Sequence, residues 1–277
     1  MLLPRFLTTV VGVPILLLSI WWGQLPFFIL ILGVAMLGLH EFYSLAEEAS
    51  WPVSKKMGLA TGFILILSIA LFGTKMGWES PARSQVFFSP AVISFLLLLY
   101  MLQHLLSKDR QNAFINIAVT WLGLFYVVWT LSHLVLIRDL RPAGLEYTIF
   151  LFLVTWVLDI AAYLGGVRFG KHRLSHNISP KKTWEGALIG SAAALVTAFL
   201  CALIFLREVS FGQIFILGAL VIVLSQVSDF SESLFKRNVQ VKDSGTLLPG
   251  HGGILDRFDS FLLTAPLYYY TLVLLNK

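Results

Sequence analysis

Charged residues and glycines cluster near the end of the chain, in the segment KDSGTLLPGHGGILDRFDS (residues 242–260). Carboxylates beside cations at a glycine-bearing turn are typical of phosphate groups held through a hard divalent metal ion. Glycines would also let backbone amides approach such a group closely. The residues that could take part are Lys242, Asp243, His251, Gly252, Gly253, Asp256, Arg257 and Asp259.

The two aspartates at the end of this segment have a helical spacing. If residues from 254 onward form a helix, Asp256 and Asp259 share one face at its start. Simple capping is an alternative, because acids at a helix N-terminus complement the helix dipole. Capping leaves the neighbouring cations and glycines unexplained, so the pattern favours a metal and phosphate site.

Two further acids lie inside apolar runs, Asp159 in TWVLDIAAYLGG and Asp229 in VLSQVSDFSESLFKR. Acids within membrane helices are costly and by default indicate a functional site. Glu232 and Ser233 follow Asp229 by three and four residues and therefore share its helix face. That face must point into the protein or into a water-filled cavity. The alternative is a polar network that only holds helices together.

A second possible anion site is the motif SPKKTWEG, residues 179–186. Here Ser179 could be the N-cap of a helix with Pro180 at its first position. Lys181 and Lys182, with the free amides of that helix start, would then bind a phosphate group. The alternative is a basic anchor beside the membrane, with Trp184 at the interface.

The elements that must position these residues are membrane helices. The chain of 277 residues is 57% hydrophobic and 13% charged, against about 25% charged residues in soluble domains. A membrane helix needs about 20 apolar residues, and the sequence therefore predicts an all-α polytopic membrane protein. We expect nine spans, near residues 6–22, 25–43, 57–73, 87–106, 114–137, 146–166, 186–206, 212–235 and 254–275.

Charge predicts the orientation of these spans. With nine spans, the N-terminus and the long basic loops 167–185 and 236–253 share one side, which carries most of the Lys and Arg residues. The positive-inside rule places that side in the cytosol. Without the two long loops the charges are nearly balanced, so the predicted orientation depends on these loops.

A family resemblance becomes visible in residues 233–259, SLFKRNVQVKDSGTLLPGHGGILDRFD. This stretch resembles the signature of the phosphatidate cytidylyltransferase (CDP-diacylglycerol synthase) family, without a departure. The SPKKTWEG motif and the segment around Asp159 are similar to further motifs of that family. By motif the resemblance covers residues 150–260, whereas the preceding part matches only in being apolar helices.

The resemblance implies a reaction in which CTP and phosphatidic acid give CDP-diacylglycerol and pyrophosphate, with Mg²⁺. Our hypothesis for the site is that its acids hold one or two metal ions. The resemblance also implies a homodimer in the lipid bilayer of the bacterial inner membrane, with a polar active-site cleft open to the cytosol and no nucleic-acid partner. Residues 1–145 would be N-terminal membrane helices and residues 146–277 the catalytic ones, within one integral membrane unit.

Under this hypothesis Asp229, Asp256 and Asp259 hold the metal, Lys and Arg side chains bind phosphates, and Asp159 lines the cleft. Either His251 donates a hydrogen bond or it fixes the turn, and Asp243 orients Lys242. The expected catalytic residues are Asp229, Lys242, Asp243, His251, Asp256 and Asp259. The expected substrate-binding residues are Asp159, Ser179, Lys181, Lys182, Ser233, Lys236, Arg237, Gly252, Gly253 and Arg257.

Three alternatives stay open at this point. A different CTP-dependent transferase, acting on another lipid, would share the nucleotide-binding residues and differ in those that face the lipid. An ion-coupled transporter would also use acids inside the membrane, but it leaves the glycine-rich cluster unexplained. A relative without activity is disfavoured because the acids and bases of the signature are intact.

Overall fold

A computed structural model of the chain describes residues 2–73, 83–106, 112–247, 250 and 252–275. Within these ranges the structure is mainly helical, and Arg173 and Thr183 form an isolated antiparallel β bridge. The predicted all-α class is therefore confirmed. The helices are α1 (Leu2–Trp22), α2 (Gln24–Glu48), α3 (Lys55–Ser68), η1 (Ile69–Gly73), α4 (Arg83–Leu106), α5 (Ala113–Gly123), η2 (Leu124–Trp129), α6 (Thr130–Asp139), α7 (Gly144–Phe169), α8 (Trp184–Ile204), α9 (Phe211–Asn238), α10 (Leu255–Leu262) and α11 (Thr264–Leu275).

Each of the nine predicted spans corresponds to helix, and three of them are made of consecutive helical pieces, such as α10 with α11. Six helices of the described chain are long and apolar enough to cross a membrane. They are Gln24–Glu48, Ala113–Asp139, Gly144–Phe169, Trp184–Ile204, Phe211–Asn238 and Leu255–Leu275. A polytopic membrane protein is thereby confirmed, while the number of nine crossings stays a prediction.

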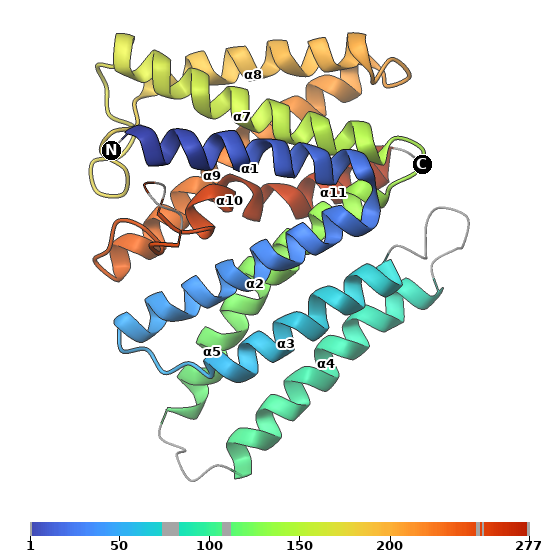
Figure 1. Cartoon of the computed structure of the whole chain (residues 1–277), viewed down its shortest axis with the longest axis vertical. Coiled ribbons are helices and arrows are strands. Elements are labelled where there is room, and N and C mark those ends of the chain that lie inside the picture. The colour runs from blue at the N-terminus through green and yellow to red at the C-terminus, as the bar shows by residue number, and fades with distance from the viewer. Residues whose placement is uncertain (1, 74–82, 107–111, 248–249, 251, 276–277) are drawn as a thin grey trace.

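Small residues bring α7 and α8 together as antiparallel neighbours (Figure 1). A Cβ atom on Gly190 would lie 2.7 Å from the carbonyl oxygen of Leu158, and one on Gly186 would lie 2.6 Å from that of Ala162. Glycine permits this approach because membrane helices associate through close backbone packing at small residues. The pair therefore holds the loop between α7 and α8 at one end of the molecule.

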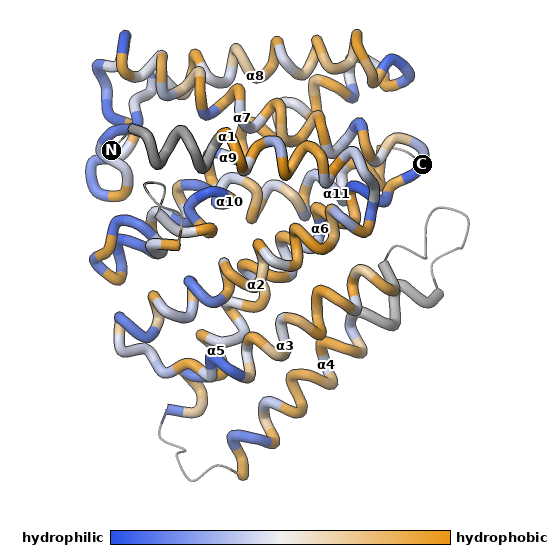
Figure 2. The backbone as a smooth tube through the Cα atoms, in the orientation of Figure 1, coloured by the Kyte–Doolittle hydropathy of each residue, from blue (hydrophilic) through white to orange (hydrophobic). Residues whose placement is uncertain are grey.

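The two long polar loops lie at the same end of the helices, near the N-terminus (Figure 1). Figure 2 shows hydrophilic residues gathered there, next to predominantly apolar helices. The loops also touch, because Arg237 Nε donates to the carbonyl oxygen of Ile178 at 3.2 Å. The two loops thus lie at one end of the helices, whereas the side of the membrane that they face stays a prediction.

The N-terminal helices pack directly against those that carry the signature. On α2, Phe42 meets Phe235 of α9 edge to face, with ring centroids 6.0 Å apart. Tyr126, in the π-helical turn η2, lies 5.0 Å from the same Phe235 ring. Aromatic pairs of this geometry stabilise packing beyond their buried area. Helix α2 is thus fixed beside the end of α9 and the start of α10.

Candidate active site

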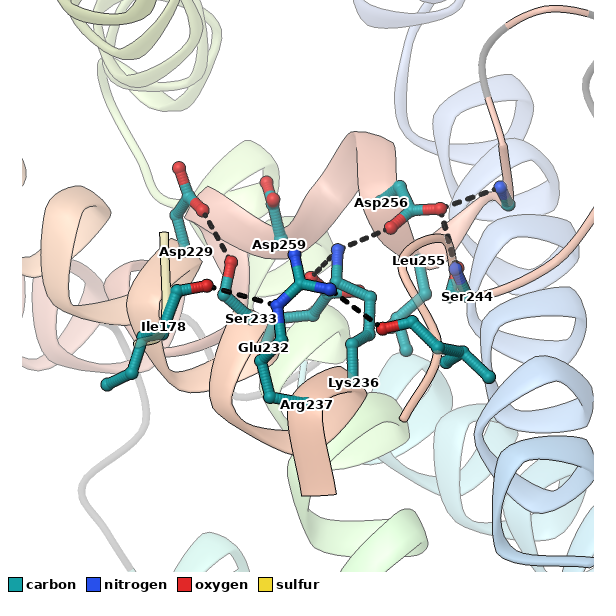
Figure 3. Close-up of polar contacts among 12 residues, drawn as sticks. Ile178, Asp229, Glu232, Ser233, Lys236, Arg237, Ser244, Leu255, Asp256 and Asp259 are labelled. Carbon is teal, nitrogen blue, oxygen red and sulfur yellow. Dashed lines mark hydrogen bonds and ion pairs between the residues drawn. The ribbon is translucent and has the colours of Figure 1, made fainter. Parts of the chain in front are cut away.

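Lys236, near the C-terminal end of α9, lies at the centre of a buried charge cluster (Figure 3). Its Nζ forms ion pairs with Glu232, one turn earlier, and with Asp256 Oδ1 at 2.6 Å. The exposed fractions of these side chains are 10% for Lys236, 1% for Glu232 and 7% for Asp256. Since buried charges must be paired, Lys236 neutralises two carboxylates on different helices.

Asp256 closes the signature loop onto the start of α10. Its Oδ2 accepts hydrogen bonds from the amides of Ser244 and Gly253, both at 2.8 Å, and lies 3.1 Å from Ser244 Oγ. Its other oxygen is engaged by Lys236. Both oxygens of Asp256 are therefore occupied by protein groups, which join residues on either side of the loop.

Two glycines of this loop are required by the close contacts. Gly252 has a φ of +82°, and a Cβ there would lie 2.6 Å from Asp256 Oδ2. A Cβ on Gly253 would overlap Ser244 Oγ and the carboxylate of Glu41. The sequence predicted that backbone amides approach a ligand here. In the structure, the Gly253 amide approaches the Asp256 carboxylate.

Further acids gather beside this cluster. Ser233 Oγ donates to Asp229 Oδ1 at 3.5 Å, and Lys182 forms an ion pair with Asp229 Oδ2. Asp259, on α10, lies near enough to Asp229, Glu232 and Asp159 for mutual electrostatic repulsion. Figure 3 shows Asp229 and Asp259 on neighbouring elements. The structure thus brings acids from α7, α9 and α10 into one region, as expected from the sequence.

The predicted helix start at Ser179 and Pro180 is wrong. Helix α8 begins at Trp184, and Thr183 is its N-cap, because the Thr183 hydroxyl accepts from the Gly186 amide at 3.1 Å. Residues 179–182 instead form a turn, in which the Lys182 amide donates to the Ser179 carbonyl at 3.2 Å. Thr183 is the better cap because its extended backbone aims the hydroxyl at the first turn.

The two lysines of the SPKKTWEG motif have different surroundings in the structure. Lys181 is exposed in the turn, whereas Lys182 extends to Asp229 and covers the ring of Phe230, 4.7 Å from its centroid. The start of the loop is held to α8 by Glu185, which accepts from the amides of Lys171 and His172. Lys182 therefore joins the acidic region through a loop rather than through a helix start.

Other predicted site residues lie at the surface, outside the buried charge cluster. Lys242 and Asp243 are exposed. Among the residues that the structure describes, these two side chains form no hydrogen bond or ion pair with each other. Arg237 Nη1 donates to the Val241 carbonyl at 3.0 Å. Arg257 is exposed and acts electrostatically on Asp159. His251 lies outside the described residues.

Sequence reasoning missed Glu41 on α2. This buried side chain accepts hydrogen bonds from the amides of Ile254 and Leu255, both at 2.9 Å. The signal that could have found it is an acid within the predicted span 25–43, since acids inside membrane helices mark sites by default. Ser244, a buried residue of the loop itself, was missed as well, and it had no recognisable signal.

The helices define a polytopic membrane protein, and acids and lysines gather at one end of them. Within this class, the chain belongs to the cytidylyltransferase family, whose model matches residues 3–275. It is 32% identical to a phosphatidate cytidylyltransferase of Bacillus subtilis, over 98% of both chains. It is similar to proteins of that name from Synechocystis sp., with 32% identity over 98% of this chain and 96% of the relative, and from Staphylococcus haemolyticus, with 34% identity over 97% and 98%.

Proposed function

We propose that this chain is a phosphatidate cytidylyltransferase, which converts CTP and phosphatidic acid to CDP-diacylglycerol and pyrophosphate. The observation that carries the proposal is the gathering of acids and lysines from α7, α9, α10 and the loop before α8 in an otherwise apolar helical protein. Family membership and the names of the relatives support the same reaction.

The chemistry requires positioning and charge neutralisation more than an enzyme nucleophile. An oxygen of the lipid phosphate attacks the α-phosphorus of CTP, forming a new P–O bond, and the bond to the β-phosphate oxygen breaks to release pyrophosphate. The ionised phosphate monoester is already nucleophilic, so no side chain must take its proton. Both substrates are anions, so preorganised cations at the site would contribute most of the catalysis.

The acids of the site fit a magnesium ion by their donor chemistry, because carboxylate oxygens are the ligands of hard divalent cations. Among the residues that the structure describes, no three such side chains form a ready-made metal site. We propose Asp229 and Asp259 as the principal ligands, joined by Asp256 if it exchanges its contact with Lys236. Their placement on neighbouring elements, beside the ammonium group of Lys182, favours a cation there. A bound magnesium ion would neutralise phosphate charge, and a second metal ion belongs to the same proposal.

The basic residues would bind the phosphate groups at the loop surface. Lys181 and Lys242 are exposed, so their ammonium groups are accessible to a soluble nucleotide. Lys182 already reaches the acids and would approach a phosphate held beside Asp229. Lys236, paired with two carboxylates, instead holds the site together.

The lipid would reach the site from the bilayer. Asp159 is exposed on α7 although it interacts with Asp229, so this flank of the acidic region is open to the outside of the helical protein. A lipid headgroup could enter there while its acyl chains stay among lipids. The bacterial inner membrane, a cytosolic N-terminus and active site, and a homodimer are further parts of the proposal.

One transfer assay tests the reaction. The chain is purified in detergent and mixed with phosphatidic acid, labelled CTP and Mg²⁺, and label is counted in the organic phase. Asp256→Asn should abolish turnover, because the side chain loses its charge and, in either orientation, its NH₂ group faces a donor, the Lys236 ammonium or the backbone N–H groups. The matched control is Glu47→Gln on exposed Glu47, which pairs with Lys55 away from the site.

Magnesium-dependent lipid label that Asp256→Asn lacks and Glu47→Gln retains would support the proposal. Label that appears only with another lipid phosphate or alcohol would instead favour a CTP-dependent transferase of different lipid specificity. No label with any acceptor, from folded protein, would refute the transferase and reopen an ion-coupled transporter. Full activity of Asp256→Asn would refute the assigned role of Asp256.

A further inference from the structure

Glu41 connects the N-terminal helices to the signature loop. It lies on α2, 6% exposed, and both of its carboxylate oxygens are engaged. Oε1 accepts from the Ile254 amide at 2.9 Å, and Oε2 accepts from the Leu255 amide at 2.9 Å. Oε2 also lies 3.0 Å from Ser244 Oγ. Every one of these partners belongs to the signature, more than 200 residues further along the chain.

These contacts supply a cap that α10 does not supply for itself. The N-cap residue of α10 is Ile254, whose side chain makes no capping hydrogen bond. The first amides of a helix lack partners within the helix, and a carboxylate near them is favoured by the helix dipole. Glu41 thus acts as an N-cap from a different helix, and it fixes the position from which Asp256 projects.

A shared hydroxyl couples Glu41 to Asp256. Ser244 Oγ lies 3.0 Å from Glu41 Oε2 and 3.1 Å from Asp256 Oδ2. A hydroxyl has one proton to donate, so the two carboxylates share the single proton of Ser244 Oγ in addition to their backbone donors. The fit leaves no spare room, because a Cβ on Gly245 would lie 2.9 Å from Glu41 Oε1.

We infer that Glu41 is a positioning residue for the nucleotide-binding half of the reaction. It holds the start of α10 against Ser244 of the signature loop, so that Asp256 keeps its contacts with Lys236 and Ser244, and Lys242 keeps its place at the loop surface. The role of Lys242 and Asp256 rests on the proposed function. Glu41 itself is covered by the loop and acts through it.

Glu41→Gln tests this inference with little change in shape. In either orientation of the glutamine amide, its NH₂ group faces one of the two backbone N–H donors, so one of them loses its acceptor. We expect the KM for CTP to rise about tenfold or more and kcat to fall, with the KM for phosphatidic acid unchanged within about twofold. Glu47→Gln, on the same helix, should behave like the wild type.

Kinetics separate positioning from a loss of folded protein. If Glu41 were merely structural, the variant would lower kcat through a smaller active fraction and leave both KM values unchanged. That result, or wild-type kinetics, would overturn the inference. A second measurement is hydrogen exchange of the Ile254 and Leu255 amides without substrates. We expect exchange about tenfold faster or more in Glu41→Gln than in Glu47→Gln.

Hydrogen exchange also distinguishes this inference from the proposed function. If the wild-type chain transfers no label to any acceptor, the proposed function fails, whereas the exchange rates still decide whether Glu41 holds the start of α10. Unchanged exchange at both amides would refute the contact itself, whatever the transfer assay shows.

Discussion

Lys236→Met should destabilise the folded protein, because it removes the cation between two buried carboxylates. Loss of this cation would affect the two acids differently. Asp256 keeps hydrogen bonds from two backbone amides. Neither side-chain oxygen of Glu232 has a hydrogen-bond partner among the described residues, so the carboxylate depends on its ion pair with Lys236. The uncompensated charge would therefore be mainly that of Glu232.

The expected magnitude follows from the burial of the pair, since Glu232 is 1% exposed and Lys236 10% exposed. Removing one partner of a buried ion pair lowers the free energy of unfolding by about 3–5 kcal/mol, and about 1 kcal/mol shifts Tm by roughly 2–4 °C in a chain of this size class. Lys236→Met should thus lower Tm by on the order of 10 °C. Adding Glu232→Gln removes the stranded charge, and the double variant should recover more than half of that loss.

Thermal unfolding in detergent micelles, followed by circular dichroism, measures both effects. The matched control is Lys55→Met, which breaks the partly exposed pair with Glu47 and should cost at most about 1 kcal/mol. A double variant no more stable than Lys236→Met would contradict the assignment of the cost to Glu232. A Tm for Lys236→Met equal to that of Lys55→Met would show that the cluster is solvated rather than buried.

Two further predictions test local contacts. Gly253→Ala should reduce transfer activity at least about tenfold, because the added Cβ would overlap Ser244 and Glu41. The control is Gly212→Ala, because Gly212 has open space around it. Equal activity of the two variants would contradict the close contact. Thr183→Val should lower the free energy of unfolding by about 1 kcal/mol, since α8 loses its N-cap; an unchanged Tm would show that Thr183 does not cap the helix.

Hydropathy alone predicted where the chain is helical. An apolar segment in lipid must satisfy its own backbone hydrogen bonds, and a helix does so locally. For this reason each predicted span is helix in the structure, including 25–43 and 212–235. The helical period also predicted that Ser233 lies on the face of Asp229, and its hydroxyl does bond that carboxylate.

Local geometry was predicted less well in the loop before α8. Ser179 and Pro180 have the side chains of a helix start, but Thr183 is the cap. Both sites offer a hydroxyl before a helix-compatible segment, so their sequence signals are similar. The choice depends on contacts outside the motif, such as the Trp184 amide donating to the His172 carbonyl at 2.9 Å and the bridge of Thr183 to Arg173.

The sequence by itself determined the membrane class, the helices and the residue types gathered in the signature, because hydropathy and helical periodicity act over a few turns of chain. It did not determine which charges meet. Only the tertiary structure pairs Lys182 with Asp229 and places Glu41 at the start of α10. These contacts join positions far apart in sequence, and their geometry depends on how whole helices pack, which no local pattern encodes.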